Sequence, residues 1–513
     1  MPRPIAHSPL SPLSPDSSLF PDGLIDPMWI EKHQDIVPSA YVCFYKFTSD
    51  PKLSTLHDNQ LKTDIGSIKS VLGRSGYRTR LIVALLSEGS ITKSPDVEDR
   101  LANIRKATGL DSKTSLFFLP PQSSQVELEA FVETIISTIY PLCIEYYRDL
   151  SKHSRRKRNR GVVPPPSSPP TAGTSQALSA QDWNVRYDFK LGVFAEFRQE
   201  MDAAVRSFES GYDGLLTEVM ETIAAWSPRW NEARVLADVF AIRILRCLLW
   251  NGNPAGAVRR WQSHRERLKD FVDRRGKGSA TYGWAAWEAR WATVMAEIIQ
   301  KSDIPEFGLD GTSFYLPLDK SIVTGELQEP WEQMHHPGYW FRLASQHLAR
   351  RRSLAHAIPE EDRSLSNTPQ LRKSRSTQSY DTYLCPGPSE EYPLPGNEGV
   401  DHALLIVETL TNAITEFKKR KQTRIVHELS ILSATESMRR EDWDSALRIL
   451  RPLWQKMSFR KEGWWGAVEE VGWALRNTAA HVGDGVTVVS VDWELLNRSL
   501  YYLFSLKEHL ANF

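Results

Sequence analysis

A helical hairpin pattern that recurs three times is the feature that most constrains how this chain can fold. In each copy a polar turn precedes a helix that carries a small residue and, four positions later, a bulky apolar residue. The small residue lets the two helices approach closely and the bulky residue fills the gap one turn on, as in tetratricopeptide repeats. The positions, with a Leu-Gly pair on the helix before the first copy, are Leu191, Gly192, Ala204, Phe208, Ala257, Trp261, Ala446 and Leu450. Three copies with matching turns predict a mainly α, tetratricopeptide-like α-solenoid.

Tryptophan usage agrees with a helical core. Fifteen of the 17 tryptophans lie between Trp226 and Trp493. Trp284, Trp287 and Trp291 are spaced i, i+3 and i+7, which places them on one helical face. An aromatic ligand groove is one interpretation of that face, and core packing between helix pairs is the commoner one. We expect core packing.

The pair Trp464 and Trp465 is a candidate partner surface. Adjacent side chains diverge on a helix, so both indoles cannot enter one helix–helix contact. We therefore predict that one of the two faces a binding partner.

Residues 28–150 alternate between strand and helix patterns. The apolar runs Tyr41–Phe47 and Leu81–Ser87, and the short run "SLFFLP", suit strands, and helical stripes follow each of them. This order predicts a small α/β domain with a parallel sheet. No glycine follows the first strand, and the segment Gly73–Arg80 precedes a strand and lacks the Lys-Ser/Thr of a phosphate loop. We expect a non-catalytic module with no cofactor.

Two segments rich in Ser and Pro divide the rest of the chain. The predicted layout is a disordered N-terminus (1–27), the α/β domain (28–150), a basic and Pro-rich linker (151–182), the first part of the solenoid (183–352), a disordered Ser/Pro-rich insertion (353–399) and the continued solenoid (400–513). The first linker begins with the basic residues Arg155, Arg156, Lys157, Arg158 and Arg160. These residues favour a solvated tether, with a nuclear import signal or a contact with anionic lipid as alternatives.

No residue set indicates catalysis or a metal. The 63 basic and 63 acidic residues cancel, which gives no reason to expect a nucleic-acid partner. Adjacent His335 and His336 lack a third ligand, and Ile431 stands where a zinc helix that begins at His427 needs its second histidine. Four scattered cysteines, with no signal peptide and no apolar run long enough to span a bilayer, predict a soluble intracellular protein.

The stretch Trp183–Leu215 resembles the signature of the foie gras family, which provides the eleventh subunit of the transport protein particle (TRAPP) tethering complex. The segments His336–Arg352 and "HQDIVPSAYVCFYKF" are similar to further stretches of that family. The residues that match the signature are Tyr187, Phe189, Lys190, Phe194, Glu196, Phe197, Gln199 and Tyr212.

The resemblance implies a non-enzymatic scaffold that acts in transport from the endoplasmic reticulum to the Golgi and in autophagy. Its partners would be other TRAPP subunits and, indirectly, the Rab-family GTPase that the complex activates by nucleotide exchange. It would lie in the cytoplasm, peripheral to ER–Golgi intermediate and cis-Golgi membranes. Family members are longer, so we expect either a truncated chain or the loss of their distal contacts. The alternative function is a peripheral membrane adaptor that binds anionic lipid through the basic cluster at Arg155–Arg160 and through Arg350–Arg352.

Overall fold

The structure is a computed structural model that divides into two compact units, Met1–Cys247 and Leu248–Phe513. It describes residues 24–25, 28–48, 52–87, 95–111, 113–120, 124–160, 178–225, 228–275, 278–302, 304, 333–363, 380–457 and 459–497. Most of the expected N-terminal tail and residues 161–177 of the first linker lie outside these ranges.

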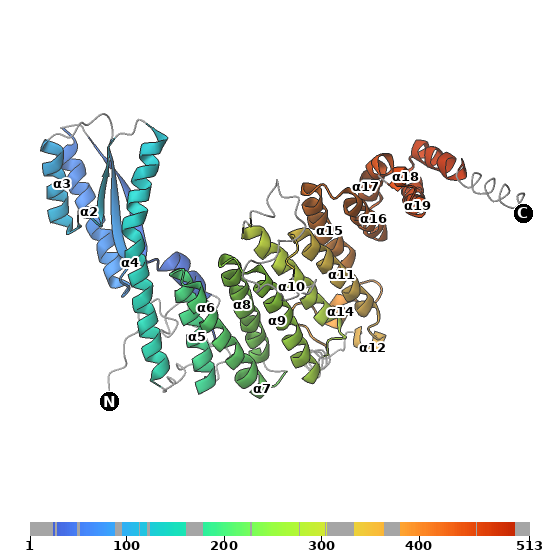
Figure 1. Cartoon of the computed structure of the whole chain (residues 1–513), viewed down its shortest axis with the longest axis horizontal. Helices are drawn as coiled ribbons and strands as arrows, with labels where there is room; N and C mark the ends of the chain where they lie inside the picture. Colours follow the sequence, from blue (N-terminus) through green and yellow to red (C-terminus); the bar gives the residue numbers. More distant parts are fainter. Residues whose placement is uncertain are drawn as a thin grey trace, which may run out of the picture. The chain divides into compact units, whose positions relative to one another are not determined.

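A three-stranded parallel sheet opens the first unit. Its strands are β1 (Ala40–Phe47), β2 (Arg80–Ser87) and β3 (Leu116–Leu119), in the order β1-β2-β3. The crossover helices α2 (Ser54–Arg74) and α3 (Pro95–Thr108) lie against each other beside the sheet (Figure 1). Right-handed crossovers between successive strands place both helices on one face. Buried Leu81, Val83 and Leu85 of β2 share a core with them. The predicted α/β domain is confirmed.

Helix α4 (Gln125–Asn159) covers the other face of the sheet and extends beyond it. Phe131 of α4 meets Phe117 of β3 edge to face, with ring centroids 6.5 Å apart. The C-terminal half of α4 packs on α5 (Ala180–Phe197), where Tyr147 lies 5.0 Å from Phe197 between ring centroids. One helix therefore belongs both to the α/β layer and to the helical region that follows.

The remaining helices of the first unit form a hairpin and its extension. Alongside the N-terminal α1 (Met28–Glu31) and the π-helix η1 (Lys32–Ile36), they are α6 (Met201–Gly214), the π-helix η2 (Leu215–Val219), α7 (Met220–Thr222) and α8 (Pro228–Trp250), which crosses into the second unit. Gly192 of α5 lies directly under Phe208 of α6: a Cβ at Gly192 would be 2.3 Å from the ring. Ala204 and Phe208 are fully buried, so the small-then-bulky arrangement is a close helix crossing here.

In the second unit, helices pack on their neighbours in chain order, as in a solenoid. Contacts run from α10 to α11, α15, α16, α17 and α19 (Figure 1). The helices are α9 (Pro254–Arg274), α10 (Tyr282–Lys301), α11 (Pro337–His356), α12 (Glu360–Arg363), α14 (Pro388–Glu391), α15 (His402–Lys419), α16 (Thr423–Arg439), α17 (Trp443–Lys456), α18 (Phe459–Glu462) and α19 (Trp465–Val482), followed by helical residues 485–497. Ala257, Trp261, Ala446 and Leu450 are all buried. The predicted solenoid is confirmed.

One turn recurs between successive helices. Its first residue is left-handed, with φ between 57° and 82°, and the next amide N–H bonds the carbonyl five residues back at 2.8–3.1 Å, a Schellman motif. The left-handed residues are Gln199, Gly252, Lys421, Glu441, Gly463 and Gly483. The sequence pattern showed polar turns but not this shared geometry, because half of the positions are not glycine.

Two predicted disordered segments are partly ordered. Leu24, in the expected disordered N-terminus, is buried, and its carbonyl accepts a 2.7 Å hydrogen bond from Arg186. In the expected insertion 353–399, Cys385 packs in a core cluster with Tyr282 and Ala355, and Glu391 is buried. Apolar and paired charged side chains within a Ser/Pro-rich stretch order these residues. Residues 364–379 lie outside the described ranges.

Substitution of Gly192 by alanine tests the close crossing. The new Cβ would overlap the Phe208 ring, so we expect Gly192→Ala to lower the free energy of unfolding by about 1–3 kcal/mol. Gly66→Ala on α2 is the control, because nothing lies within 4 Å of its added Cβ. That change should stabilise by about 1 kcal/mol through helix propensity. Urea unfolding measures both, and equal effects would contradict the crossing.

Substitution of glutamate by glycine at two positions, one inside the recurring turn and one outside it, tests whether the turn is strained. Glu441 has φ 59°, so Glu441→Gly should relieve backbone strain and raise the free energy of unfolding by up to about 1 kcal/mol. The same change at exposed Glu408, inside α15, should lower it by about 1 kcal/mol. A loss of stability at both positions in thermal unfolding would show that the turn is not strained.

Candidate functional site

The residues of the Trp183–Leu215 signature are mostly structural. Tyr187, Phe189, Phe194 and Tyr212 are buried, with at most 4% of each exposed. The carboxylate of Glu196 forms ion pairs with Arg243 and Arg246 of α8, and Gln199 is the left-handed residue of the first turn. Phe197 packs on Tyr147. Lys190 alone presents a charge with aromatic neighbours, 5.1 Å from the Trp29 ring centroid.

The basic residues that we predicted to begin a solvated tether belong to a helix instead, because α4 continues through Asn159. This part of the prediction is wrong. Ser151 and Ser154 are buried, and Ser151 accepts a hydrogen bond from Arg198. Arg158 forms a 2.9 Å ion pair with Asp188 of α5. Positive side chains in the last turns also interact favourably with the helix dipole.

The members of the basic cluster therefore differ in how far they are buried. Lys157 and Arg158 are half-buried, whereas Arg155, Arg156 and Arg160 are exposed. These three arginines are the part of the predicted import or lipid contact that stays open to solvent.

Arg350, Arg351 and Arg352 of α11 reach three different elements. Consecutive side chains on a helix point about 100° apart, so each meets its own partner. Arg350 contacts Glu288 of α10 at 3.3 Å, and Arg351 holds Glu391 of α14 at 2.6 and 2.7 Å. Arg351 and Arg352 are thus paired inside the protein, whereas Arg350 is half exposed, and the lipid contact at Arg350–Arg352 stays a prediction.

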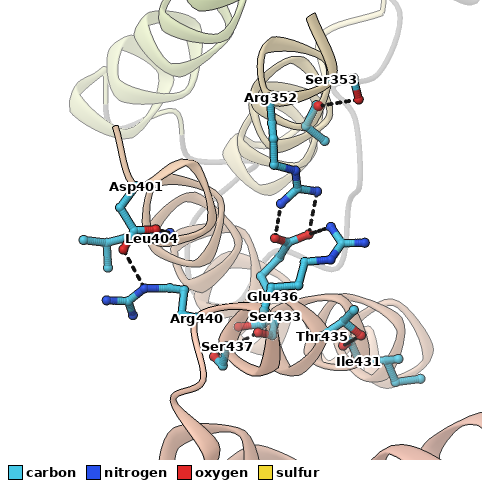
Figure 2. Close-up of polar contacts among 12 residues, drawn as sticks. Arg352, Ser353, Asp401, Leu404, Ile431, Ser433, Thr435, Glu436, Ser437 and Arg440 are labelled. Carbon is cyan, nitrogen blue, oxygen red and sulfur yellow. Dashed lines mark hydrogen bonds and ion pairs between the residues drawn. The ribbon is translucent and has the colours of Figure 1, made fainter. Parts of the chain in front are cut away.

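Figure 2 shows the third of these ion pairs. Both carboxylate oxygens of Glu436 on α16 face the guanidinium of Arg352, with one contact at 3.0 Å. Arg439 donates to the same carboxylate at 2.9 Å. Nearby, Asp401 accepts hydrogen bonds from the Leu404 amide at the start of α15 and from Arg440. The polar cluster links α11, α15 and α16.

The carboxylate of Glu288 is buried and held ionised. Arg265 of α9 donates to it at 2.6 and 2.9 Å, and His347 lies 3.3 Å away. Burial alone would raise the pKa of Glu288, but the hydrogen bonds and charges of His347 and Arg265 outweigh it and lower the pKa to about 2. The charge is structural, since its partners all come from neighbouring helices.

The tryptophan face of α10 is core, as expected. Trp284, Trp287 and Trp291 are at most 2% exposed and stack in succession, with centroids 4.6 and 5.8 Å apart. Trp261 and Trp291 donate indole N–H groups to each other's carbonyl at 3.1 and 3.2 Å. This reciprocal pair fixes the contact between α9 and α10 and leaves no aromatic groove on this face.

The histidine pair has a structural role in part. His336 accepts a hydrogen bond from the Gly338 amide and caps α11. Within the described ranges no group of three or more His, Cys, Asp or Glu residues could hold a metal ion. No described helix is both long and apolar enough to cross a membrane.

Several exposed tryptophans lie on or beside the C-terminal helices. Trp464 is 54% exposed and Trp465 41%, so both members of the predicted pair face solvent in part. Trp464 also stacks on Phe459, with parallel rings 5.7 Å apart. Trp473 of α19 is 53% exposed.

An exposed apolar stripe that the sequence analysis missed lies on helical residues 485–497. The spacing i, i+3, i+7 and i+10 places its members on one face. The stripe consists of Val486, Val489, Trp493 and Leu496, which are 62–83% exposed. On the opposite face Val491 and Leu495 enter the core formed by α16, α17 and α19. We call the exposed face the C-terminal stripe.

Comparison with known proteins agrees with the repeated helices. The profile described as "Foie gras liver health family 1" matches residues 229–498, more than half of the chain. The chain belongs to the foie gras family. A second profile, "Trafficking protein particle complex subunit 11 N-terminal domain", matches residues 1–128, which include the parallel sheet.

Known proteins that match this chain have the name that appears in the second profile. Proteins called "Trafficking protein particle complex subunit 11" are 23% identical over 469 residues in Gallus gallus and 22% identical over 473 residues in Homo sapiens. The alignments cover 87% and 88% of this chain but 37% of each relative. The chain thus spans somewhat more than a third of the length of these relatives.

The ion pairs of Glu288 predict that the free energy of unfolding decreases at low pH. Because its folded pKa is about 2, below the ordinary value of 4.5, its contribution is full above pH 4.5 and disappears as the pH falls toward 2. Glu288→Gln should cost roughly 3 kcal/mol at pH 7 and progressively less below pH 4.5. Urea unfolding at several pH values measures the difference, with Glu408→Gln as the exposed control. A gap that does not narrow in acid would contradict the assignment.

Proposed function

We propose that this chain is a non-catalytic scaffold subunit of a TRAPP-type tethering complex. Membership of the foie gras family and the printed names of its relatives support that assignment. By the same resemblance, the complex activates a Rab-family GTPase in ER-to-Golgi transport and autophagy, through other subunits. The chain would act at the cytoplasmic surface of ER–Golgi intermediate and cis-Golgi membranes.

The C-terminal stripe is the observation that carries the scaffold role. A helix that closes one core with Val491 and Leu495, yet exposes four large apolar side chains on its other face, has a face suited to a further protein. The stripe has the spacing by which amphipathic helices recognise one another. Trp493, 71% exposed at its centre, has the size and position of an interface hot spot.

The buried charges also favour a scaffold. Glu288, Glu391, Glu416 and Glu436 are buried, and each is paired with an arginine. Such pairs fix which helix lies against which, and they leave these carboxylates committed to structure. A rigid array of helices that presents an apolar face is what a subunit needs to hold a neighbour in place.

Co-purification from cells tests the proposal. The chain, tagged and at native expression, should recover other TRAPP subunits at low salt. The double variant Val489→Ser with Trp493→Ala should reduce that recovery at least tenfold, because truncation of a buried hot-spot side chain costs more than about 2 kcal/mol. Both side chains are exposed here, so the melting temperature of the isolated variant should not change.

Trp250→Ala is the matched control. Trp250 is 66% exposed, similar to Trp493, and lies at the end of α8, outside the C-terminal stripe. Its truncation should leave recovery unchanged. Recovery of the wild-type chain alone would contradict the scaffold role, and equal losses with both variants would contradict the stripe as its contact.

A further inference from the structure

Three lysines from three segments of the first unit lie around one set of aromatic rings. Lys32 and Lys190 face the rings with their ammonium groups, and Lys157 meets them through its backbone carbonyl. Lys32 lies in η1, Lys157 near the end of α4, and Lys190 in α5. The Lys32 ammonium is 5.2 Å from the Tyr77 ring centroid, and that of Lys190 is 5.3 Å from the centroid of Tyr187. We call Lys32, Lys157 and Lys190 the lysine cluster.

The aromatic side chains around the cluster are packed on one another. Trp29, which faces Lys190, lies 4.8 Å from the His33 ring, and His33 lies 6.3 Å from Tyr77. On the other side Trp183 lies 4.8 Å from Tyr187 and donates its indole N–H to the carbonyl of Lys157. The backbone positions of the three lysines are therefore fixed by packing.

Among the side chains that the structure describes, no carboxylate forms a hydrogen bond or ion pair with these lysines. Several arginines of the same unit do have such partners: Arg158 is paired with Asp188, Arg198 with Glu200, and Arg243 with Glu196. Lys32 is nevertheless only 1% exposed. A buried ammonium without a counter-charge is costly, and the described side chains leave the charge of Lys32 unpaired.

The pKa values of the cluster are lowered, as expected for cations that lie close together and away from solvent. Burial, and then the charge of Lys157, lower the pKa of Lys32 to about 8. Burial, with the charges of Arg186, Lys157 and Lys32, holds the pKa of Lys190 well below its usual range. Burial and the charges of Lys32 and Lys190 lower the pKa of His33 to about 3, and its Nδ1 has no hydrogen-bond partner. Each of these shifts comes from burial and neighbouring cations.

We propose that the lysine cluster binds an anion that carries clustered phosphate groups. Lysine ammonium groups bind phosphate as point charges, and a polyanion would supply the counter-charge that three lysines lack. Lys157 and Lys190 are partly exposed and Lys32 is buried, so an anion would approach from the side of Lys157 and Lys190. The same chemistry suits the headgroup of a phosphoinositide lipid and a soluble inositol polyphosphate. This site is separate from the partner contact proposed for the C-terminal stripe.

Calorimetry on the full chain tests binding, with inositol hexakisphosphate as the soluble probe. We expect saturable binding and an increase of several degrees in melting temperature. Binding should also take up protons near pH 8, because the anion restores the charge of lysines that burial has partly neutralised. Proton uptake is detected when the measured heat of binding changes with the ionisation enthalpy of the buffer.

Variants separate a binding role from a structural one. Lys190→Met keeps the length and apolar character of the stem, removes the charge, and should fold at least as stably as the wild type. It should weaken hexakisphosphate binding at least tenfold and reduce proton uptake. Lys106→Met, at an exposed position of α3, is the control and should leave affinity unchanged. Equal affinity of the wild type and Lys190→Met, or no binding by the wild type, would overturn the proposal.

Vesicle flotation distinguishes the two sources of phosphate. Phosphatidylcholine vesicles with and without phosphatidylinositol 4-phosphate provide the lipid probe. Flotation that needs the phosphoinositide and is lost in Lys190→Met would assign the site to a lipid headgroup. Binding of hexakisphosphate without flotation would assign it to a soluble polyphosphate. Absence of both would overturn the site.

Discussion

Ion pairs between buried glutamates and the arginines of α11 connect the second unit. The largest helix contacts there otherwise run between neighbours in the chain, and apolar ridges alone allow several registers between two helices. Arg351 reaches Glu391 with two hydrogen bonds, and Arg352 reaches Glu436 in the same bidentate way. A pair of this kind contributes little net stability, because both charges lose their hydration. Its effect is selective: any other register would leave a carboxylate buried and unpaired.

The architecture was accessible from the sequence because its determinants are local. The small and bulky residues of each hairpin lie four positions apart, and Gly192 meets Phe208 as that pattern predicts. The long-range ion pairs were not accessible. Arg352 and Glu436 are separated by 84 positions, and each residue alone resembles a solvated charge. For the same reason Arg350–Arg352 resembled a lipid contact, and the Ser/Pro-rich stretch around Cys385 resembled a disordered loop.

The candidate sites show the same division. The divergence of adjacent side chains predicts that at least one of Trp464 and Trp465 is exposed, and both are in part. The C-terminal stripe could also have been found, since Val486, Val489 and Trp493 have plain helical spacing, but spacing alone does not distinguish an exposed face from a buried one. The lysine cluster had no signal at all. Lys32, Lys157 and Lys190 are far apart in the chain, and only the fold brings them to one set of rings.

The two kinds of cation in this protein have different roles. Arginine, with its planar fork, satisfies the buried carboxylates Glu288, Glu391 and Glu436, where geometry decides which helices meet. Lysine, a compact charge on a flexible stem, occupies a cluster around buried Lys32 in which no described carboxylate side chain is a partner. If the cluster had only a structural role, replacing its ammonium groups with apolar groups would remove an unpaired buried charge without lowering the stability of the fold. The presence of three lysines at these positions is expected if an anion supplies the missing charge from outside the chain.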